Sequence, residues 1–580
     1  MSLSSSLQIG RSALTASQVA IQITGNNFAN AATPGYSRQI VGLAPMRDGQ
    51  SGSFFVGRGV YVQGVHRQID SALQARMWAG VSQESASSMD LSLLSSVEST
   101  LNELSDSDLS SELSSFFNAW SELANSPGAA GSRSLIVQQG ATLAGYMRNL
   151  RSDLGSLRTQ VDRQLDATVS AADQLLTQIA DLNESIVTAE GGSGEAMGLR
   201  DQRDSLITEL SRFMDASTIE QPSGAIDVLI GSVPVVLGGH SRGIQLERQS
   251  GDDGIEVSIS VRDDGQQLSI AMGSVGSLMS QRDTLVNDTV NRLDSLASQL
   301  IFQVNRIHST GYSGTPMTST AGTRAVPLAD RSRALSDTAN QTFSGLPFHA
   351  VTGGFNVTVK NNSTGATETV RIDVDLDGLD AAGAPGFGDD TSLDDIQGAM
   401  AGIANLTATL NPDGTLNLAA TEGYSFSFSE DSSGALAVLG VNSYFTGTDA
   451  SDINVRAALQ AEPALLSTGC MVDGQPSDNG AALALAALQD QAIGALGGQS
   501  IRESWRTAVQ SVAMRTDFAN TRADATTLVR ESLEAQRAAV SGVSVDEEAI
   551  NLMNYQRQYQ GAARFITVVD ELTQTLLSMV

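Results

Sequence analysis

Residues 3 to 28 carry a seven-residue repeat that a lone helix in water cannot bury. Small residues (Gly10, Ser17 and Thr24) alternate with large apolar ones. The large residues form one stripe: Leu3, Leu7, Leu14, Ile21 and Phe28. One large and one small residue per heptad predicts a helix that packs closely against a second helix. The alternative is an ordinary amphipathic helix that covers a domain of its own.

The other end of the chain has a matching pattern. Ser544 and Glu547 predict a capping box at the start of a helix. Apolar residues then recur at steps of three and four: Leu552, Tyr555, Tyr559, Ala562, Ile566, Val569, Leu572, Leu576 and Met579. The pattern predicts a helix of about 35 residues, roughly 50 Å long at 1.5 Å per residue. Since helices are stable in water mainly through burial of such a face, we expect the two ends to pack on each other, on other subunits or on both, and to be poorly ordered in a monomer.

Helical patterns also dominate the chain between these ends. We expect helices at about 83–125, 132–190, 199–213, 277–308 and 500–539, with short strands and Gly or Asp-Gly turns at about 215–272. The run at 132–190 would reach about 85 Å, which is longer than a compact globule uses.

The composition changes to strands and turns between 331 and 455. Runs such as 353–361 and 406–420 alternate in hydropathy, and Asn411-Pro412-Asp413-Gly414 predicts a hairpin. The fold class is therefore mainly α with inserted β domains, in an elongated multi-domain chain. We expect a terminal coiled-coil-like helical domain at 1–60 and 541–580. A long-helix body would cover 61–330 and 456–540, and 331–455 would be a β-rich outer insert.

Charge and composition exclude several function classes. The 580 residues carry a net charge of -30, so a phosphate backbone would repel the chain and nucleic acid is not an expected partner. Residues 1 to 80 differ, with six arginines against Asp48 and Asp70. One cysteine, Cys470, rules out a disulfide framework within the chain. No run approaches the ~18 apolar residues of a membrane span, so we expect no membrane insertion. The beginning of the sequence lacks the pattern of a cleavable secretory signal.

Two motifs resemble known functional sites, a nucleophile elbow and a calcium-binding loop. Gly239-His240-Ser241-Arg242-Gly243 fits the hydrolase nucleophile elbow, but strand-like sequence follows it where the elbow needs a helix, so we interpret it as a hairpin. The run from Asp373 to Gly378 resembles the start of a calcium loop, but its twelfth position is Ala384 and not an acid. We interpret it as a solvated turn, with weak calcium binding left open. We expect no catalytic residues, metal or cofactor.

The segment NNFANAATPGYSRQ, residues 26 to 39, ends the first helix abruptly. Pro34 biases its predecessor out of the helical region, and Gly35 permits backbone angles that a larger residue does not. The amides of Asn26, Asn27 and Asn30 can bond the turn itself or a neighbouring subunit. The alternative is a plain helix-ending loop.

This segment and the C-terminal run VSVDEEAINLMNYQRQYQGAARFITVVDELTQTLL together resemble the bacterial flagellar axial proteins, which are the rod, hook and hook-associated subunits. The resemblance covers about a fifth of the chain. Tyr36-Ser37-Arg38-Gln39, the long helices and LRDQRDSLITEL favour the subunits at the junction between hook and filament. The resemblance implies an extracellular structural role without catalysis, in a ring of identical subunits that contacts hook subunits and a second junction protein. It also implies secretion through the flagellar export apparatus, with a cytoplasmic export chaperone that covers the C-terminal helix.

The resemblance assigns three sets of site residues. The N-terminal assembly helix uses the large stripe of residues 3 to 28. The turn motif comprises Asn26, Asn27, Asn30, Thr33, Pro34, Gly35, Tyr36 and Arg38. The C-terminal assembly and chaperone-binding helix uses Leu552, Tyr555, Tyr559, Ala562, Ile566, Val569, Leu572 and Leu576.

Other interpretations remain open. The chain could be another axial subunit, such as the second junction protein or the hook subunit. A surface adhesin would instead bind ligands through residues 335 to 455. An enzyme would require Ser241 to react with a fluorophosphonate probe, and we expect no reaction.

Overall fold

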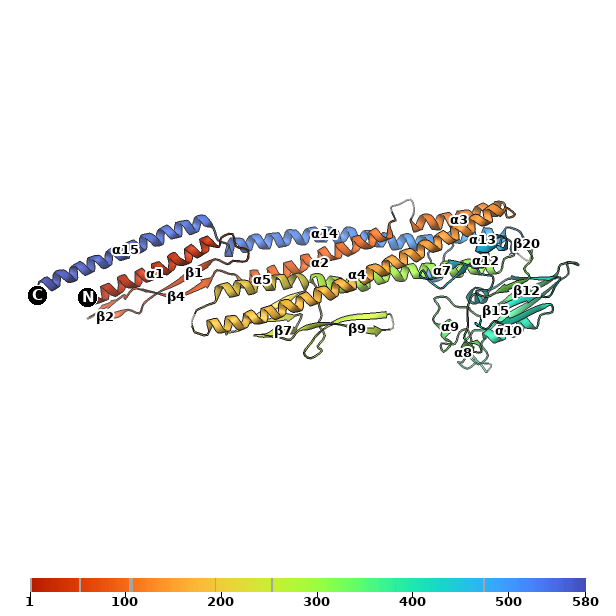
Figure 1. Ribbon diagram of the computed structural model, residues 1–580, viewed down its shortest axis with the longest axis horizontal. Helices are drawn as coiled ribbons and strands as arrows, with labels where there is room; N and C mark the ends of the chain where they lie inside the picture. Colours follow the sequence, from red (N-terminus) through yellow and green to blue (C-terminus); the bar gives the residue numbers. More distant parts are fainter. Residues whose placement is uncertain are drawn as a thin grey trace. The chain divides into compact units, whose positions relative to one another are not determined.

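The computed structural model describes residues 3–51, 54–103, 108–192, 194–251, 254–380, 382–472 and 475–579 (Figure 1). The chain forms two compact units. The first comprises residues 1–93, 160–282 and 517–580, and the second comprises residues 94–159 and 283–516. Three long α-helices contribute residues to both units, and so does the short π-helix at Arg282–Asn287. The long helices are α2 (Ser71–Leu101), α4 (Ala130–Glu190) and α14 (Ile501–Ser541).

The two ends of the chain meet in the first unit. Helix α1 (Leu3–Ala29) lies antiparallel beside α15 (Val545–Ser578), as Figure 1 shows. Two strands that the sequence analysis missed, β1 (Gln39–Pro45) and β4 (Val60–Arg67), pair antiparallel and pack against α1. A smaller hairpin, β2 (Gly49–Ser51) with β3 (Phe54–Val56), lies between them in sequence.

The rest of the first unit packs strands against helices. Helix α5 (Met197–Phe213) contacts α6 (Gly273–Gln281). One antiparallel sheet has the order β5 (Ala216–Glu220), β6 (Ile226–Ile230), β7 (Val233–Leu237) and β8 (His240–Ser241), and β9 (Ile244–Gly251) pairs with β10 (Gly254–Val261). Arg203 on α5 is fully buried and donates to the Asn183 side chain and to the Gly224 carbonyl. These bonds tie α4, α5 and the loop before β6 together.

Aromatic side chains form the core of the helical part of the second unit. Phe116 and Trp120 of α3 (Leu109–Asn125) meet Tyr444 at ring-centroid distances of 5.7 Å each. The Tyr444 hydroxyl donates to the Ile136 carbonyl of α4 at 2.8 Å, so the buried phenol is satisfied. Around this core lie α7 (Asp288–Ser309), α11 (Ala435–Leu439), α12 (Ala457–Ala461) and α13 (Gly480–Ala487).

The β-rich part of the second unit holds two three-stranded sheets. One has the order β13 (Thr367–Val374), β12 (Gly353–Asn361) and β16 (Tyr424–Ser429). The other has the order β11 (Ser319–Ala321), β15 (Leu416–Ala420) and β14 (Leu406–Leu410). Helix α10 (Leu393–Ala401) packs on β14 and starts with a capping box formed by Ser392 and Asp395. The remaining short elements are α8 (Leu328–Arg331), α9 (Gln341–Ser344), β17 (Phe445–Thr446), β18 (Asn454–Val455), β19 (Cys470–Val472) and β20 (Gln475–Ser477).

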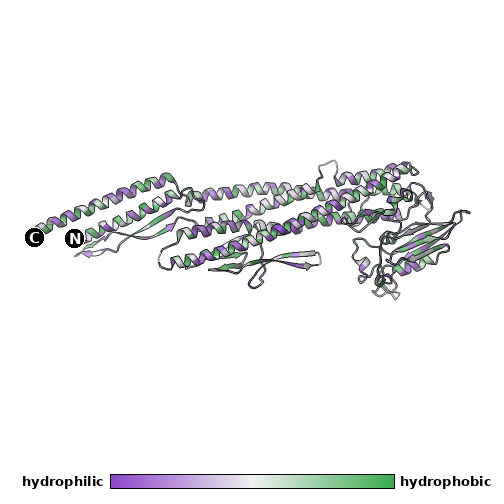
Figure 2. Ribbon diagram, viewed as in Figure 1, coloured by the Kyte–Doolittle hydropathy of each residue, from purple (hydrophilic) through white to green (hydrophobic). Residues whose placement is uncertain are grey.

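Most of the predicted elements are confirmed. The run predicted at 132–190 is one helix at 130–190, and the predicted hairpin at Asn411–Gly414 joins β14 to β15, with Gly414 at a φ of 88°. Figure 2 shows hydrophilic and hydrophobic residues interleaved along the long helices, as the periodicity predicts. The division of the chain into three domains stays a prediction.

One predicted helix was wrong in extent, and another contains a π-helical turn. The helix expected at 83–125 is two helices, α2 and α3, because Asn102 adopts a left-handed φ of 49° and the Asp108 side chain caps α3 by accepting from the Ser111 N–H. The helix expected at 277–308 is interrupted by a π-helical turn at Arg282–Asn287 between α6 and α7. The sequence reasoning also missed α10.

A substitution at Gly140 on α4 tests the packing of the aromatic core. A Cβ at this position would lie 2.1 Å from the Tyr444 hydroxyl oxygen, whereas a Cβ at Gly145 on the same helix would meet only the Arg148 guanidinium at 3.9 Å. We expect Gly140→Ala to lower the free energy of unfolding of the second unit by about 1–3 kcal/mol through overpacking. Gly145→Ala should instead raise it by up to about 1 kcal/mol through helix propensity. Denaturant titration followed by tryptophan fluorescence measures both, and equal effects would contradict this packing.

Candidate assembly interface at the joined ends of the chain

The turn after α1 is held by its own asparagines. Helix α1 ends at Ala29, close to the end at residues 31–32 that Pro34 predicts. The Asn30 side chain donates to the Asn26 carbonyl at 3.0 Å, and the Thr33 hydroxyl donates to the Asn30 side chain. Gly35 has a φ of 80°, which a residue with a Cβ rarely adopts. The chain can therefore reverse direction within a few residues.

Asn27 is the centre of this turn and is 1% exposed. Its amide nitrogen donates to the Gln39 carbonyl at 2.9 Å and to Glu548 Oε2 of α15 at 3.1 Å. Its oxygen accepts from the Gln39 N–H at 3.0 Å and from the Tyr36 hydroxyl at 2.8 Å. All four hydrogen-bonding positions of the amide are used, so no other side chain of this size can replace it.

Arg38 makes the second link from the turn to the C-terminal segment. Its Nη2 lies 2.7 Å from Glu548 Oε1, and its Nη1 lies 3.0 Å from Glu547 Oε2. Its backbone N–H donates to the Ser541 carbonyl at the end of α14. The Glu548 side chain is only 2% exposed, so the guanidinium and the Asn27 amide offset the cost of burying its charge. Asn27, Tyr36, Arg38 and Glu548 together are called the terminal lock below.

Helix α5 supports the terminal lock from the body of the same unit. Arg67 at the end of β4 lies 3.0 Å from an oxygen of Asp201 and 2.7 Å from one of Asp204, and all three side chains are nearly buried. Asp201 also accepts from the Ser37 N–H at 3.3 Å. Both acids lie in the run LRDQRDSLITEL, but no pattern in the sequence linked them to Arg67.

The α1 stripe is divided between two faces. The buried residues of α1 are small or polar: Gly10, Ala16, Ser17, Ala20, Thr24 and Asn27. A Cβ on Gly10 would lie 2.6 Å from Ile566, so the absence of a side chain there lets α15 approach. The predicted large residues Leu3, Leu7, Leu14 and Ile21 are half-buried, and Phe28 is 50% exposed.

The α15 residues divide in the same way. Val569 is buried, and Leu552, Tyr555, Ala562 and Ile566 are half-buried. Tyr559, Leu572 and Leu576 remain exposed. Sequence reasoning missed a second set of exposed apolar residues on this helix: Ile550, Met553, Phe565 and Val568. Successive residues of a helix are 100° apart, so these four lie with Leu572 and Leu576 on one face, whose edge at Phe565 meets α1 beside Gly10. We call these six residues the free face of α15.

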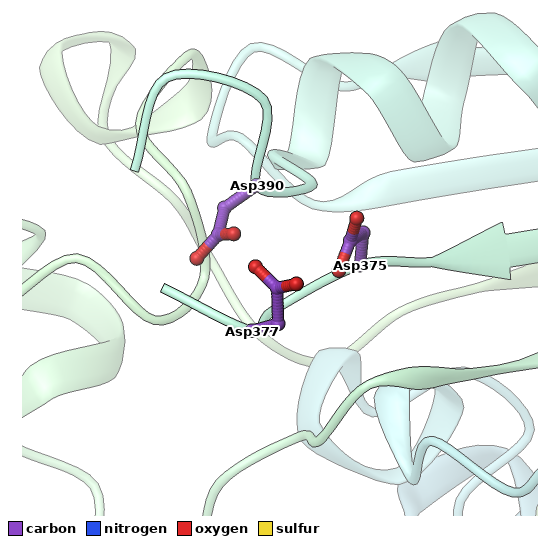
Figure 3. A group of neighbouring side chains, drawn as sticks. All are labelled: Asp375, Asp377 and Asp390. Carbon is purple, nitrogen blue, oxygen red and sulfur yellow. The ribbon is translucent and has the colours of Figure 1, made fainter. Parts of the chain in front are cut away.

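The two motifs that resemble a hydrolase elbow and a calcium loop lie on a β-hairpin and in an acidic loop. Ser241 lies on a β-hairpin between β7 and β9 and not on a strand–turn–helix. In the acidic loop, Asp375, Asp377 and Asp390 bring carboxylate oxygens within 4.8 Å of one another (Figure 3). Asp390 accepts from the Ser336 hydroxyl and the Gly378 N–H, and Asp377 accepts from the Leu379 N–H. The carboxylates of Asp377 and Asp390 therefore stabilise the loop. The strand β13 precedes the cluster, where the calcium-binding motif has a helix. Weak calcium binding by this loop stays an open interpretation.

Within the described part of the chain, every helix falls short of the length or the apolar character that crossing a bilayer requires.

Comparison with known proteins finds three matching families, in chain order. Residues 7–36 match the flagella basal body rod protein family, and residues 94–322 match the helical domain of the flagellar hook-associated protein FlgK. Residues 535–579 match the C-terminal region of the flagellar basal body rod FlgEFG proteins. The two terminal matches cover α1 with its turn and α15, which are the segments that the terminal lock joins.

Two curated relatives agree with these matches. Flagellar hook-associated protein 1 of Salmonella typhimurium is 25% identical over 100% of both chains. The protein of the same name from Bacillus subtilis is 32% identical over 38% of this chain, which is 44% of its own length. A solved structure of the flagellar hook junction protein FlgK from Burkholderia pseudomallei covers 80% of this chain and 100% of its own, with 13% identity and a TM-score of 0.48.

Two terminal helices joined beside an Asn-rich turn, with rod-protein matches at both ends, define an axial structural protein of the bacterial flagellum. Within that class, the chain is similar over its full length to flagellar hook-associated protein 1. This similarity implies a location in the extracellular flagellum.

Asn27 tests the terminal lock. Asn27→Ala leaves the Gln39 N–H and carbonyl and the Tyr36 hydroxyl without their partner, and we expect it to lower the free energy of local opening of α1 and α15 by about 2–4 kcal/mol. Asn30→Ala, which removes only exposed bonds, should cost less than about 1 kcal/mol. Hydrogen–deuterium exchange of the two helices measures both. Equal protection in the two variants would mean that the lock does not join the ends.

Tyr36 gives the terminal lock a pH dependence. Burial, with the nearby carboxylates of Asp201 and Glu548, raises the pKa of Tyr36 to about 12. This is above the ordinary value of about 10, so the packed neutral phenol stabilises the turn fully below about pH 10. That contribution is lost as the pH rises through about 12. We expect the tyrosinate absorbance difference between the native chain and Tyr36→Phe to titrate near pH 12, and a midpoint near 10 would contradict the packing of Tyr36.

Proposed function

We propose that the chain is a structural subunit that forms the junction between the flagellar hook and the filament and lets the filament assemble. The observation that carries this proposal is the locked pair of terminal helices, which still presents a free apolar face. In this proposal identical subunits form a ring, and the locked terminal segments are their contact surfaces. The domains are those expected from the sequence, with the terminal domain at 1–60 and 541–580 and the outer insert at 331–455.

The free face of α15 supports a role in assembly. Its six residues are between 44% and 54% exposed, and they lie on one continuous helix. Contiguous apolar surface of this kind marks a protein contact, because water disfavours it. Packing of identical subunits around a closed ring would bury the same face on every copy.

The same surface explains the partners that the resemblance implies. Hook subunits would lie on one side of the ring and a second junction protein on the other. Before secretion through the flagellar export apparatus, a cytoplasmic chaperone would cover α15, since an exposed apolar helix would otherwise self-associate. We propose no catalytic step, because Ser241 lies on a hairpin that lacks the elbow geometry.

Complementation of a deletion strain tests this function. Cells that lack the gene should have bare hooks in electron micrographs and release monomeric flagellin into the medium. The native gene should restore filaments, and a copy truncated before residue 545 should not. Intact filaments in the deletion strain would contradict the junction role and favour the adhesin, whereas loss of the hooks would indicate a rod or hook subunit.

A pair of neighbouring substitutions tests the free face itself. Val568 is 53% exposed on that face, and Thr567 is an exposed residue on the polar side of the same helix. Val568→Asp places a charge where a subunit contact would exclude water. Burying that charge is costly, so we expect at least a tenfold loss of filamented cells in the complementation assay. Thr567→Asp introduces the same charge one residue away and should complement normally. Equal complementation by the two variants would exclude this face from assembly.

A further inference from the structure

An apolar groove of about 430 Å³ lies between α1, α15 and the β1–β4 hairpin. Its lining includes Ala13 and Ala20 of α1, Leu43 of β1, and Gly561 and Phe565 of α15. Protein interiors leave few voids larger than a water molecule, whose share of liquid volume is about 30 Å³. A Cβ placed on Gly561 would meet no other atom within 4 Å. The groove therefore has room for large apolar side chains from elsewhere.

The tip of α15 carries side chains of that kind. Gly10 lies level with Ile566, and Asn27 lies level with Glu548, so the antiparallel register puts Leu3 level with roughly Thr573. The rest of α15 extends past the first described residue of α1. This overhang exposes three large side chains: Leu576 at 53%, Leu577 at 74% and Met579 at 78%.

The chain segments around the groove and the tip of α15 carry opposite charges. The residues that line the groove are uncharged. The segments that supply them, residues 3–29, 43–60 and 555–565, contain Arg11, Arg47, Arg58, Arg557 and Arg564 against the single acid Asp48. They are basic in a chain whose net charge is -30. Residues 570–579 contain Asp570 and Glu571 and no lysine or arginine. Complementary charge of this kind orients partners as they meet.

We propose that the tip of α15 of one copy inserts into the groove of a second copy of this chain. The tip cannot reach the groove of its own chain, because Gly561 and Leu577 lie on one continuous helix and are about 24 Å apart at 1.5 Å per residue. The contact joins two different surfaces, so it is heterologous and passes from subunit to subunit around a ring or along a helix. It rests on the proposed function, for which it names the surfaces that join the subunits.

Cysteine cross-linking tests this contact in assembled flagella. The chain would carry Gly561→Cys and Leu577→Cys with Cys470→Ser, in cells that lack the native gene. A disulfide requires Cα atoms within about 7 Å, so a bond between these positions must join two copies. After assembly under reducing conditions, isolation and oxidation, we expect a ladder of dimers, trimers and larger species on a non-reducing gel.

The matched control moves one cysteine out of the groove. Gly25 is exposed on α1, a Cβ there would meet no other atom within 4 Å, and it does not line the groove. Gly25→Cys with Leu577→Cys should give no ladder. Absence of the ladder from the groove pair, in cells that still grow filaments, would overturn the contact and leave the proposed function standing. A cross-link to a different axial subunit, identified by mass, would also overturn it.

A second pair of variants tests the contact without cysteines. Gly561→Leu puts a large side chain into the groove from a position where a Cβ meets no other atom within 4 Å, so we expect at least tenfold fewer filamented cells. Gly25→Leu places the same side chain outside the groove and should complement normally. Normal filaments with Gly561→Leu would overturn the proposal.

Discussion

One buried amide joins the two ends of this chain. Asn27 and Glu548 are 521 positions apart in sequence, and the hydrogen bond between them is 3.1 Å long. The entropy cost of closing a loop grows only with the logarithm of its length, and the folded helices of the body already bring the ends together. The amide therefore selects the register of α1 against α15 at little extra cost. The ion pair between Arg38 and Glu548 favours the same register of α1 against α15, because any other register would leave Glu548 buried without its cation.

The register divides each terminal helix into an inner and an outer face. Small residues of α1 face α15, and Ile566 occupies the space that Gly10 leaves open. Close approach of the two helices leaves the larger apolar residues at the edges and on the outside. The paired helices therefore still have apolar surface to bury against other molecules.

Periodicity in the sequence predicted the long helices because their apolar residues recur every three or four positions over many turns. The run at 130–190 is the clearest case. The break between α2 and α3 was not predictable in this way, since it depends on Asn102 adopting a left-handed conformation and on a cap at Asp108. The β1–β4 hairpin was missed because its strands are half-exposed, pack against α1 and are separated by a second small hairpin.

The sequence predicted which residues form the site, but not which of them pair with one another. The Asn-rich turn and both helices were identified from the sequence, and Asn27 and Arg38 were among the named positions. Their partner Glu548 lies beside Glu547, and the sequence pattern assigned capping to Glu547, whose carboxylate instead meets Arg38. The pairing of Arg67 with Asp201 and Asp204 depends on how β4 and α5 meet in three dimensions, which no local pattern encodes.

The central claim is that the terminal lock shapes a surface that the assembled flagellum buries. The most direct measurement is a cryo-electron microscopy structure of the hook–filament junction from the source bacterium at side-chain resolution. We expect this chain in the ring, with Asn27 bonded to Glu548 and with the free face of α15 covered by neighbouring subunits. A junction in which that face meets solvent, or in which α1 and α15 of one chain are separated, would contradict it.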